Sequence, residues 1–67
     1  MKILLIGANG QIGTELAVAL AERHGDAAVV TSDLAPQGKV PGLAHEALDC
    51  TDIGALTEIV QRHGITQ

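Results

Sequence analysis

The sequence has no aromatic residue and only one cysteine, and both absences limit what this chain does by itself. Among its 67 residues there is no Phe, Tyr or Trp, the side chains that supply much of the contact area in cores and binding sites. The single cysteine, Cys50, excludes an internal disulfide, and no Cys/His cluster has the spacing of a zinc site. A domain this short is marginally stable without such a staple. We therefore expect residues 1–67 to be the N-terminal part of a larger domain.

Basic residues and long apolar runs are also scarce. Four Lys and Arg residues stand against eight Asp and Glu residues, so the formal net charge is −4 and no basic stripe is present for a nucleic acid. The first apolar run, residues 3–6, is too short for a signal peptide or a membrane span. We therefore expect a cytoplasmic protein that binds neither nucleic acid nor membrane.

Short apolar runs predict the strands of the fold. Residues 3–6 and 27–31 are continuous runs of the kind found in strands buried on both faces of a parallel sheet. Residues 46–49 are predicted to form a short third strand, after an irregular loop over residues 34–42 that contains both prolines. Residues 65–67 are predicted to approach a further strand.

Two segments with helical spacing alternate with these strands. The first is predicted to end at His24 and Gly25, where a basic side chain precedes a glycine. The second is predicted to begin at a cap supplied by Thr51 or Asp52 and to end in the same way at Gly64. The predicted buried faces comprise Ile12, Leu16, Ala19, Leu20 and the stem of Arg23 in the first helix, and Ile53, Leu56, Ile59 and Val60 in the second.

A glycine-rich turn joins the first strand to the first helix with the pattern G-x-x-G-x-x-G, a variant of the dinucleotide-binding fingerprint. Gly7 allows a sharp turn, Gly10 leaves room for a pyrophosphate, and Gly13 allows the helix to pack close to the strand. The N–H groups of Gln11 and Ile12 are expected to point toward the phosphates, aided by the helix dipole. A turn that merely joins strand and helix is the alternative. A P-loop is excluded because no Gly-Lys-Ser/Thr follows.

Strand–helix alternation around this turn predicts an α/β fold. The order is that of the N-terminal β-α-β-β-α portion of a Rossmann-type, doubly wound parallel sheet. Asp33 lies 20 positions after Gly13, where the fingerprint expects a carboxylate that binds the adenosine ribose. A carboxylate repels a 2′-phosphate and no Arg adjoins Asp33, so NAD is favoured over NADP; Lys39 is the nearest cation downstream. The alternative is a turn or cap aspartate.

Asp49 and Cys50 follow the third predicted strand, at the sheet edge where parallel sheets bind ligands. The Asp49 carboxylate is an acceptor for an adenine amino group, and the Cys50 N–H is a donor to the ring. The alternative is that these residues only cap the second helix. Cys50 is expected to be a small buried residue, because no His is placed to activate it. His45 is expected in a loop, and His63 in the last turn of the second helix.

Together these segments resemble an extended short-chain dehydrogenase/reductase. Residues 1–13, with their Gly-Gln-Ile-Gly ending, carry the likeness to the superfamily. Residues 32–34 and 48–52 narrow it to the short-chain type of L-threonine 3-dehydrogenase, a relative of the nucleotide-sugar epimerases. The resemblance covers the whole chain. It implies a homodimer that oxidises the 3-hydroxyl of L-threonine to 2-amino-3-ketobutyrate, with hydride transfer to NAD.

The resemblance also implies which residues contact the cofactor and which part of the enzyme lies elsewhere. It places the pyrophosphate at the glycine turn, the ribose at the end of the second strand and the adenine at the end of the third. The family's base is a Tyr in a Tyr-x-x-x-Lys pair, and this chain has no Tyr, so we expect no catalytic residue within it. A nucleotide-sugar epimerase or dehydratase, a non-catalytic dinucleotide sensor and a structural piece that binds nothing remain as alternatives. The expected cofactor-binding residues are Gly7, Gly10, Gln11, Ile12, Gly13, Asp33, Leu34, Asp49 and Cys50.

Overall fold

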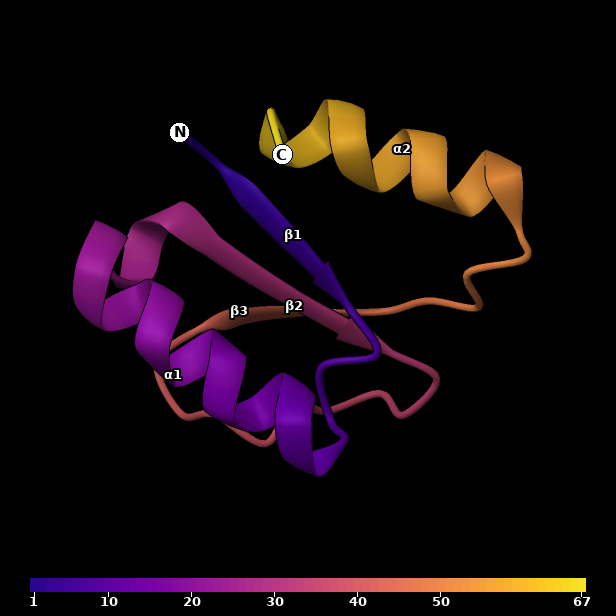
Figure 1. Cartoon of the computed structure of the whole chain (residues 1–67). Coiled ribbons are helices and arrows are strands. Elements are labelled where there is room, and N and C mark those ends of the chain that lie inside the picture. Colours follow the sequence, from indigo (N-terminus) through magenta and orange to yellow (C-terminus); the bar gives the residue numbers. More distant parts are fainter.

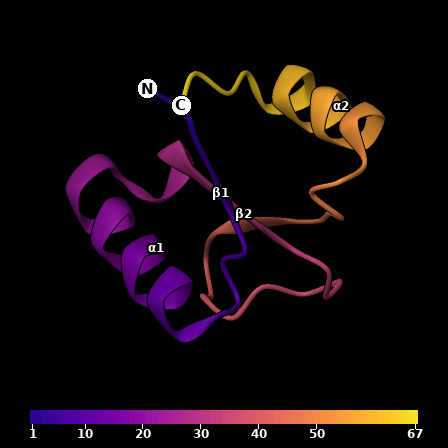
Figure 2. The same ribbon diagram turned by 45° about the vertical axis from the view of Figure 1, so that its right-hand side comes forward.

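Three parallel strands form the centre of the fold, and one helix lies on each side of them. The computed structural model describes residues 1–67, with the elements in the order β1 (Ile3–Ile6), α1 (Gln11–His24), the short 3₁₀ turn η1 (Asp26–Ala28), β2 (Val29–Asp33), β3 (Ala44–Ala47) and α2 (Ile53–His63). The sheet order is β1-β2-β3, and both neighbouring pairs are parallel. The helices α1 and α2 lie on opposite sides of the sheet (Figure 1; Figure 2). The predicted doubly wound α/β portion is confirmed. Neither α1 nor α2 has the length and apolar composition that a membrane span requires.

The middle strand, β2, supplies the centre of the core. Val29 and Val30 are almost completely buried, which is typical of a strand covered on both faces. The prediction that residues 3–6 are also buried on both faces is wrong for the end of β1, because Ile6 is 47% exposed. The prediction that residues 27–31 form one strand also needs correction, since residues 27 and 28 belong to η1.

The last residues of the chain, which were predicted to approach a further strand, lie beside the free edge of β1. The N–H of Leu4 donates to the carbonyl of Gln67 at 2.9 Å, and the N–H of Gln67 donates to the carbonyl of Lys2 at 3.1 Å. This reciprocal pair is the pattern of two parallel strands. Residues 65–67 therefore continue the sheet on the side of β1 away from β2.

Small residues, not large ones, face the sheet from α1. Ala17 and Ala21 are its buried positions, whereas Ile12 is 81% exposed and Leu16 is 44% exposed. A side chain at Gly13 would place its Cβ 2.6 Å from the carbonyl oxygen of Gly7. The backbone of α1 thus approaches the turn too closely for a side chain at position 13. The predicted buried face of α1, built on its largest apolar residues, is wrong because the helix packs through Ala17 and Ala21 instead.

The second helix agrees better with its prediction. Asp52 is the cap, because its Oδ1 accepts a hydrogen bond from the N–H of Ala55 at 3.1 Å, and Gly64 ends the helix with a left-handed φ of 65°. Ile59 is buried on the predicted face. Ile53 is 75% exposed, because the first turn of α2 extends beyond the sheet.

The third strand lies two residues earlier than predicted. Its register pairs Val30 with Ala44 and Asp33 with Ala47, so His45 is a strand residue and not a loop residue. Leu48 follows the strand, is 5% exposed, and donates its N–H to the carbonyl of Asp33 at 2.8 Å. Leu48 therefore extends the backbone pairing of β3 with β2 by one hydrogen bond and packs its side chain at the end of the sheet.

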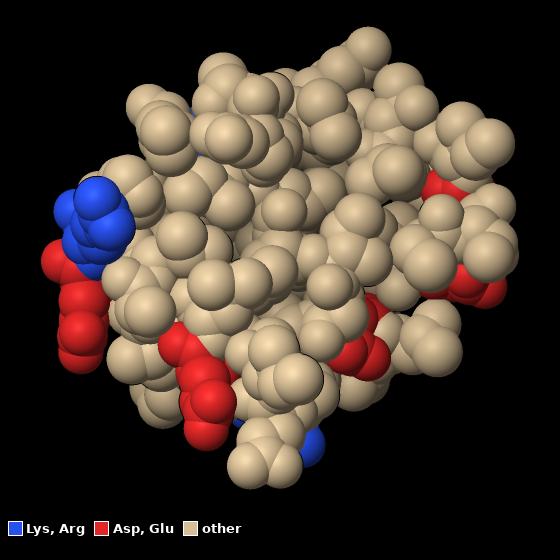
Figure 3. Space-filling view, in the orientation of Figure 1, with Lys and Arg blue, Asp and Glu red and all other residues tan.

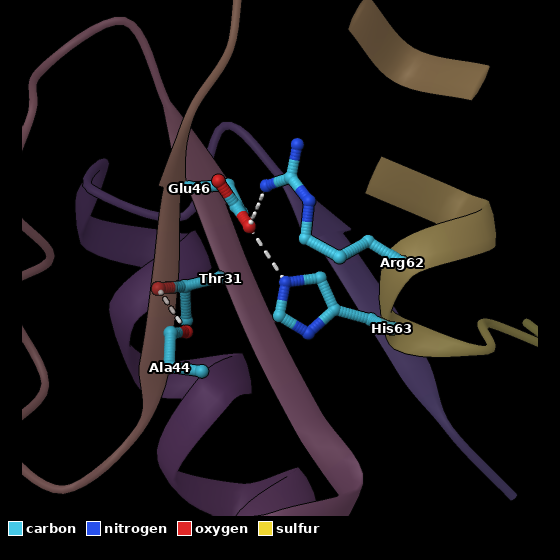
Figure 4. Close-up of polar contacts among 5 residues, drawn as sticks. All are labelled: Thr31, Ala44, Glu46, Arg62 and His63. Carbon is cyan, nitrogen blue, oxygen red and sulfur yellow. Dashed lines mark hydrogen bonds and ion pairs between the residues drawn. The ribbon is translucent and has the colours of Figure 1, made fainter. Parts of the chain in front are cut away.

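A charged cluster joins the end of α2 to β3 (Figure 4). Oε2 of Glu46 lies 2.7 Å from the guanidinium of Arg62 and 2.6 Å from Nε2 of His63. Hydrogen bonds from His63, and then from Arg62, hold the pKa of the Glu46 carboxyl below its ordinary value, against the opposing effect of burial. On the face of the molecule that Figure 3 shows, the basic side chains form no continuous stripe.

Candidate dinucleotide-binding site

The glycine turn leaves β1 and starts α1 with a fixed path. Gly7 has a φ of 76°, a conformation that residues with a side chain rarely adopt, so it makes the sharp turn that the sequence predicts. The N–H of Ala8 donates to the carbonyl of Ser32 at 2.9 Å, which ties the turn to β2. The hydroxyl of Thr14 donates to the carbonyl of Gly10 at 2.8 Å and also lies 3.1 Å from that of Ala8. The turn is therefore held in place without a ligand.

The amino end of α1 has no side-chain cap. The N–H of Thr14 is the first to bond back along the helix, to the carbonyl of Gly10 at 2.8 Å. The N–H groups of Gln11, Ile12 and Gly13 have no partner in the chain, and no acidic residue lies in the first turn. Unpaired N–H groups at the positive end of a helix dipole form a site for an anion such as a phosphate.

Gly10 shows that the space in front of this helix end does not serve the protein's own packing. Its φ of −69° and ψ of 165° suit any residue, and a Cβ there would meet only the carbonyl oxygen of Gly7, at 3.7 Å. The fold itself therefore does not require glycine at this position. A close approach by a ligand is the reason that remains, and this observation fits a pyrophosphate at the turn.

Asp33 lies at the end of β2, directly beside the glycine turn. Its Oδ2 accepts the N–H of Asn9 at 3.0 Å, and its Oδ1 accepts the N–H of Leu34 at 2.8 Å. The hydrogen bond from Asn9, followed by that from Leu34, lowers the pKa of this carboxyl, so it is ionised at neutral pH. A carboxylate has about four acceptor positions, which leaves room for further hydrogen bonds from ribose hydroxyls.

A cleft opens at the carboxyl ends of all three strands. Its volume is about 220 Å³, smaller than the ~300–1,000 Å³ typical of a whole small-molecule site, so it fits one part of a dinucleotide. Five of the nine predicted residues line this cleft, and the four from Gly10 to Gly13 lie instead at the start of α1. Ile6 and Leu48 were missed by the sequence analysis, although each is the last apolar residue before a turn. The lining residues are Ile6, Gly7, Asp33, Leu34, Leu48, Asp49 and Cys50.

Asp49 and Cys50 form the far wall of the cleft. Oδ1 of Asp49 accepts hydrogen bonds from the hydroxyl of Thr51 at 2.6 Å and from its N–H at 3.0 Å, and these bonds lower the Asp49 pKa. Because Asp52 caps α2, Asp49 is not needed for that purpose. Cys50 is exposed, so the prediction that it is buried is wrong. It lies in the turn between the carboxyl end of β3 and the start of α2.

Comparisons with known proteins identify relatives of this chain. The sequence model of the NAD dependent epimerase/dehydratase family matches residues 3–67. An uncharacterized epimerase/dehydratase from Staphylococcus epidermidis is 41% identical over 63 residues, which is 90% of this chain and 20% of that protein.

Solved structures give a similar result. A GalE-like L-threonine dehydrogenase from Cupriavidus necator is 60% identical with a TM-score of 0.98, over all of this chain and 22% of that one. An L-threonine dehydrogenase from Clostridium difficile is 33% identical with a TM-score of 0.86, over 96% of this chain and 21% of that one. The chain thus spans about a fifth of the length of the proteins that it matches.

Proposed function

The chain belongs to the NAD dependent epimerase/dehydratase family, and we propose that it is the N-terminal, NAD-binding part of an L-threonine 3-dehydrogenase. The observation that carries the proposal is the position of the ionised Asp33 carboxylate next to the uncapped start of α1. One group suits ribose hydroxyls and the other suits phosphates, and they lie on two sides of the same turn. The similarity to L-threonine dehydrogenases supports the choice of substrate.

Each part of the proposed site takes a different part of the cofactor. The N–H groups at the start of α1 bind the pyrophosphate, and Gly7 and Gly10 let it approach the backbone. Asp33, with Leu34, binds the adenosine ribose and repels a 2′-phosphate. The adenine lies in the cleft, between apolar side chains and the polar wall of Asp49 and Cys50. When bound, NAD supplies the hydride acceptor, and the residues of this chain orient it.

The catalytic and substrate-binding residues are proposed to lie outside residues 1–67. A Tyr-x-x-x-Lys pair is the base expected from the family resemblance, and the chain has no Tyr. The homodimer and the cytoplasmic location also remain predictions from the sequence.

Activity of the intact protein tests the proposal. With L-threonine and NAD, we expect NADH to appear in an absorbance assay, with little turnover when NADP replaces NAD. Matched assays with UDP- and TDP-sugars test the alternative of an epimerase or dehydratase. Turnover of a nucleotide sugar without turnover of threonine would overturn the choice of substrate. NAD binding without any turnover would favour a dinucleotide sensor.

A further inference from the structure

Asn9 makes two contacts that join the glycine turn to the chain that follows β2. Its backbone N–H donates to Oδ2 of Asp33 at 3.0 Å. Its side-chain Nδ2 donates to the backbone carbonyl of Gln37, also at 3.0 Å. One residue thus holds both the proposed ribose carboxylate and the loop that begins directly after it.

The loop after β2 connects two parallel strands without a helix, so other contacts must hold it in place. Residues 34–43 lead from the end of β2 to the start of the parallel strand β3, a crossover that a helix usually makes. His45 holds the loop from β3, with Nε2 3.0 Å from the carbonyl oxygen of Ala35. Gly38 packs closely against the same imidazole, since a Cβ there would lie 2.9 Å from Nδ1. Asn9 supplies the side-chain anchor from the glycine turn.

The orientation of the Asn9 amide is fixed, and it leaves one atom without a partner. Oδ1 of Asn9 is buried and has no hydrogen bond, the single such side-chain atom in the chain. Turning the amide over would place this acceptor against the carbonyl oxygen of Gln37, so Nδ2 must face Gln37. A buried acceptor without a partner is unfavourable, and alanine here would avoid that burial. The amide therefore does not serve stability alone.

We propose that Asn9 is a positioning residue that makes the site select a ribose with a free 2′-hydroxyl over a ribose with a 2′-phosphate. This inference rests on the proposed function. The N–H of Asn9 is a donor that a phosphate would use, and Asp33 occupies it. Its amide keeps the loop against the turn, which keeps Asp33 in that position. Without the amide, the loop is released at Gln37, the carboxylate gains freedom to turn away, and the N–H becomes available to a 2′-phosphate.

The test is a calorimetric titration of the intact protein with NAD and with NADP. In Asn9→Ala, we expect NAD affinity to fall about 3- to 10-fold, the equivalent of one hydrogen bond, while NADP affinity stays the same or rises. Asn9→Leu has a similar size without the donor and without an added charge, and it should lower the NAD-to-NADP ratio at least as much. Gln37→Ala is the matched control, because it keeps the carbonyl that Asn9 contacts and removes an exposed side chain with no hydrogen bond.

The ratio of the two affinities separates positioning from a general loss of structure. If Asn9→Ala and Asn9→Leu keep the wild-type ratio, or weaken both cofactors equally, the inference is overturned while NAD binding by the protein stands. If Gln37→Ala lowers the ratio as much as Asn9→Ala, the loop and not the Asn9 amide sets the selectivity, and the inference is also overturned. Failure of the wild-type protein to bind NAD would overturn the proposed function as well.

Discussion

The two helices begin in opposite ways, although each starts shortly after the carboxyl end of a parallel strand. In α2, the carboxylate of Asp52 accepts the N–H of Ala55, so a side chain of the protein caps the first turn. In α1, Gly10 occupies the cap position and offers no side chain, so the first N–H groups stay unpaired. The first N–H groups of a helix are thus used to stabilise the fold in α2, whereas in α1 they remain available to a ligand.

The glycines near the two helix starts differ in how much space a Cβ would have. A Cβ at Gly13 of α1 would lie 2.6 Å from one backbone atom and 2.9 Å from another, both in the preceding turn. A Cβ at Gly54 of α2 would meet only Oδ1 of Asp52, at an ordinary 3.6 Å. Close packing thus dictates glycine in α1, where the turn must lie against the helix, and not in α2.

The largest effect on stability is expected from Gly13→Ala. Because its Cβ meets backbone and not a flexible side chain, the turn or the helix must shift, and we expect a loss near the upper end of about 1–3 kcal/mol. Urea unfolding of the intact protein measures it. Gly54→Ala is the matched control and should raise stability by up to about 1 kcal/mol, because alanine favours helix. Equal stability of the two variants would contradict the difference between the helix starts.

The next effect concerns the carboxylate beside the open helix start. Asp33→Ala should weaken NAD binding about 10- to 100-fold, since hydrogen bonds to a charged group are lost, and should relax the rejection of NADP. Asp26→Ala is the matched control, because it removes the same charge from η1, away from the cleft. It should leave the affinities for NAD and NADP unchanged. An unchanged preference for NAD in Asp33→Ala, measured by calorimetry, would show that Asp33 is not the ribose ligand.

Removing the cap of α2 should affect stability without affecting the cofactor. Asp52→Ala loses the hydrogen bond to Ala55 and is expected to reduce stability by about 1 kcal/mol, while Asp52→Ser keeps a cap and most of the stability. The affinity for NAD should stay within about twofold of wild type in both variants, because Asp52 does not line the cleft. A large loss of NAD affinity would mean that both helix starts bind the cofactor.

The smallest effect is a pH dependence at the other end of α2. The folded pKa of Glu46 lies below its usual value of 4.5 because His63 and Arg62 bond to the carboxylate. The stabilisation is therefore complete above pH 4.5 and is lost as the pH falls through the lowered folded value. We expect less than about 1 kcal/mol, since the cluster is partly exposed.

Glu46→Gln tests this dependence by urea unfolding at pH 7 and pH 3. The variant should lose less stability between these pH values than wild type does. Glu58→Gln, which lies in α2 and has no ion pair, should behave as wild type. A wild-type pH dependence in Glu46→Gln would assign the effect to other carboxylates.

The sequence predicted the features that depend on neighbouring residues. The glycine turn, the end of α2 at Gly64 and the alternation of strands and helices follow from local rules of conformation. Of the two cap candidates that the sequence left open, the structure selects Asp52 because its carboxylate reaches the N–H of Ala55.

Features that depend on distant contacts were not predictable in this way. The buried face of α1 was wrong because tight packing uses Ala17 and Ala21, which a search for large apolar residues overlooks. The contacts of Glu46 with α2 and of Asn9 with Gln37 join segments 16 to 28 positions apart, and spacing alone does not reveal them.

The most direct test of the account is NAD titration of Gly10→Val in the intact protein. The backbone at Gly10 suits valine and the fold leaves space for its Cβ, so thermal unfolding should match that of wild type. The side chain would fill the space in front of the open N–H groups of α1, and we predict that NAD binding is lost. A stable Gly10→Val variant that binds NAD with wild-type affinity would contradict the claim that the phosphates lie at this helix start.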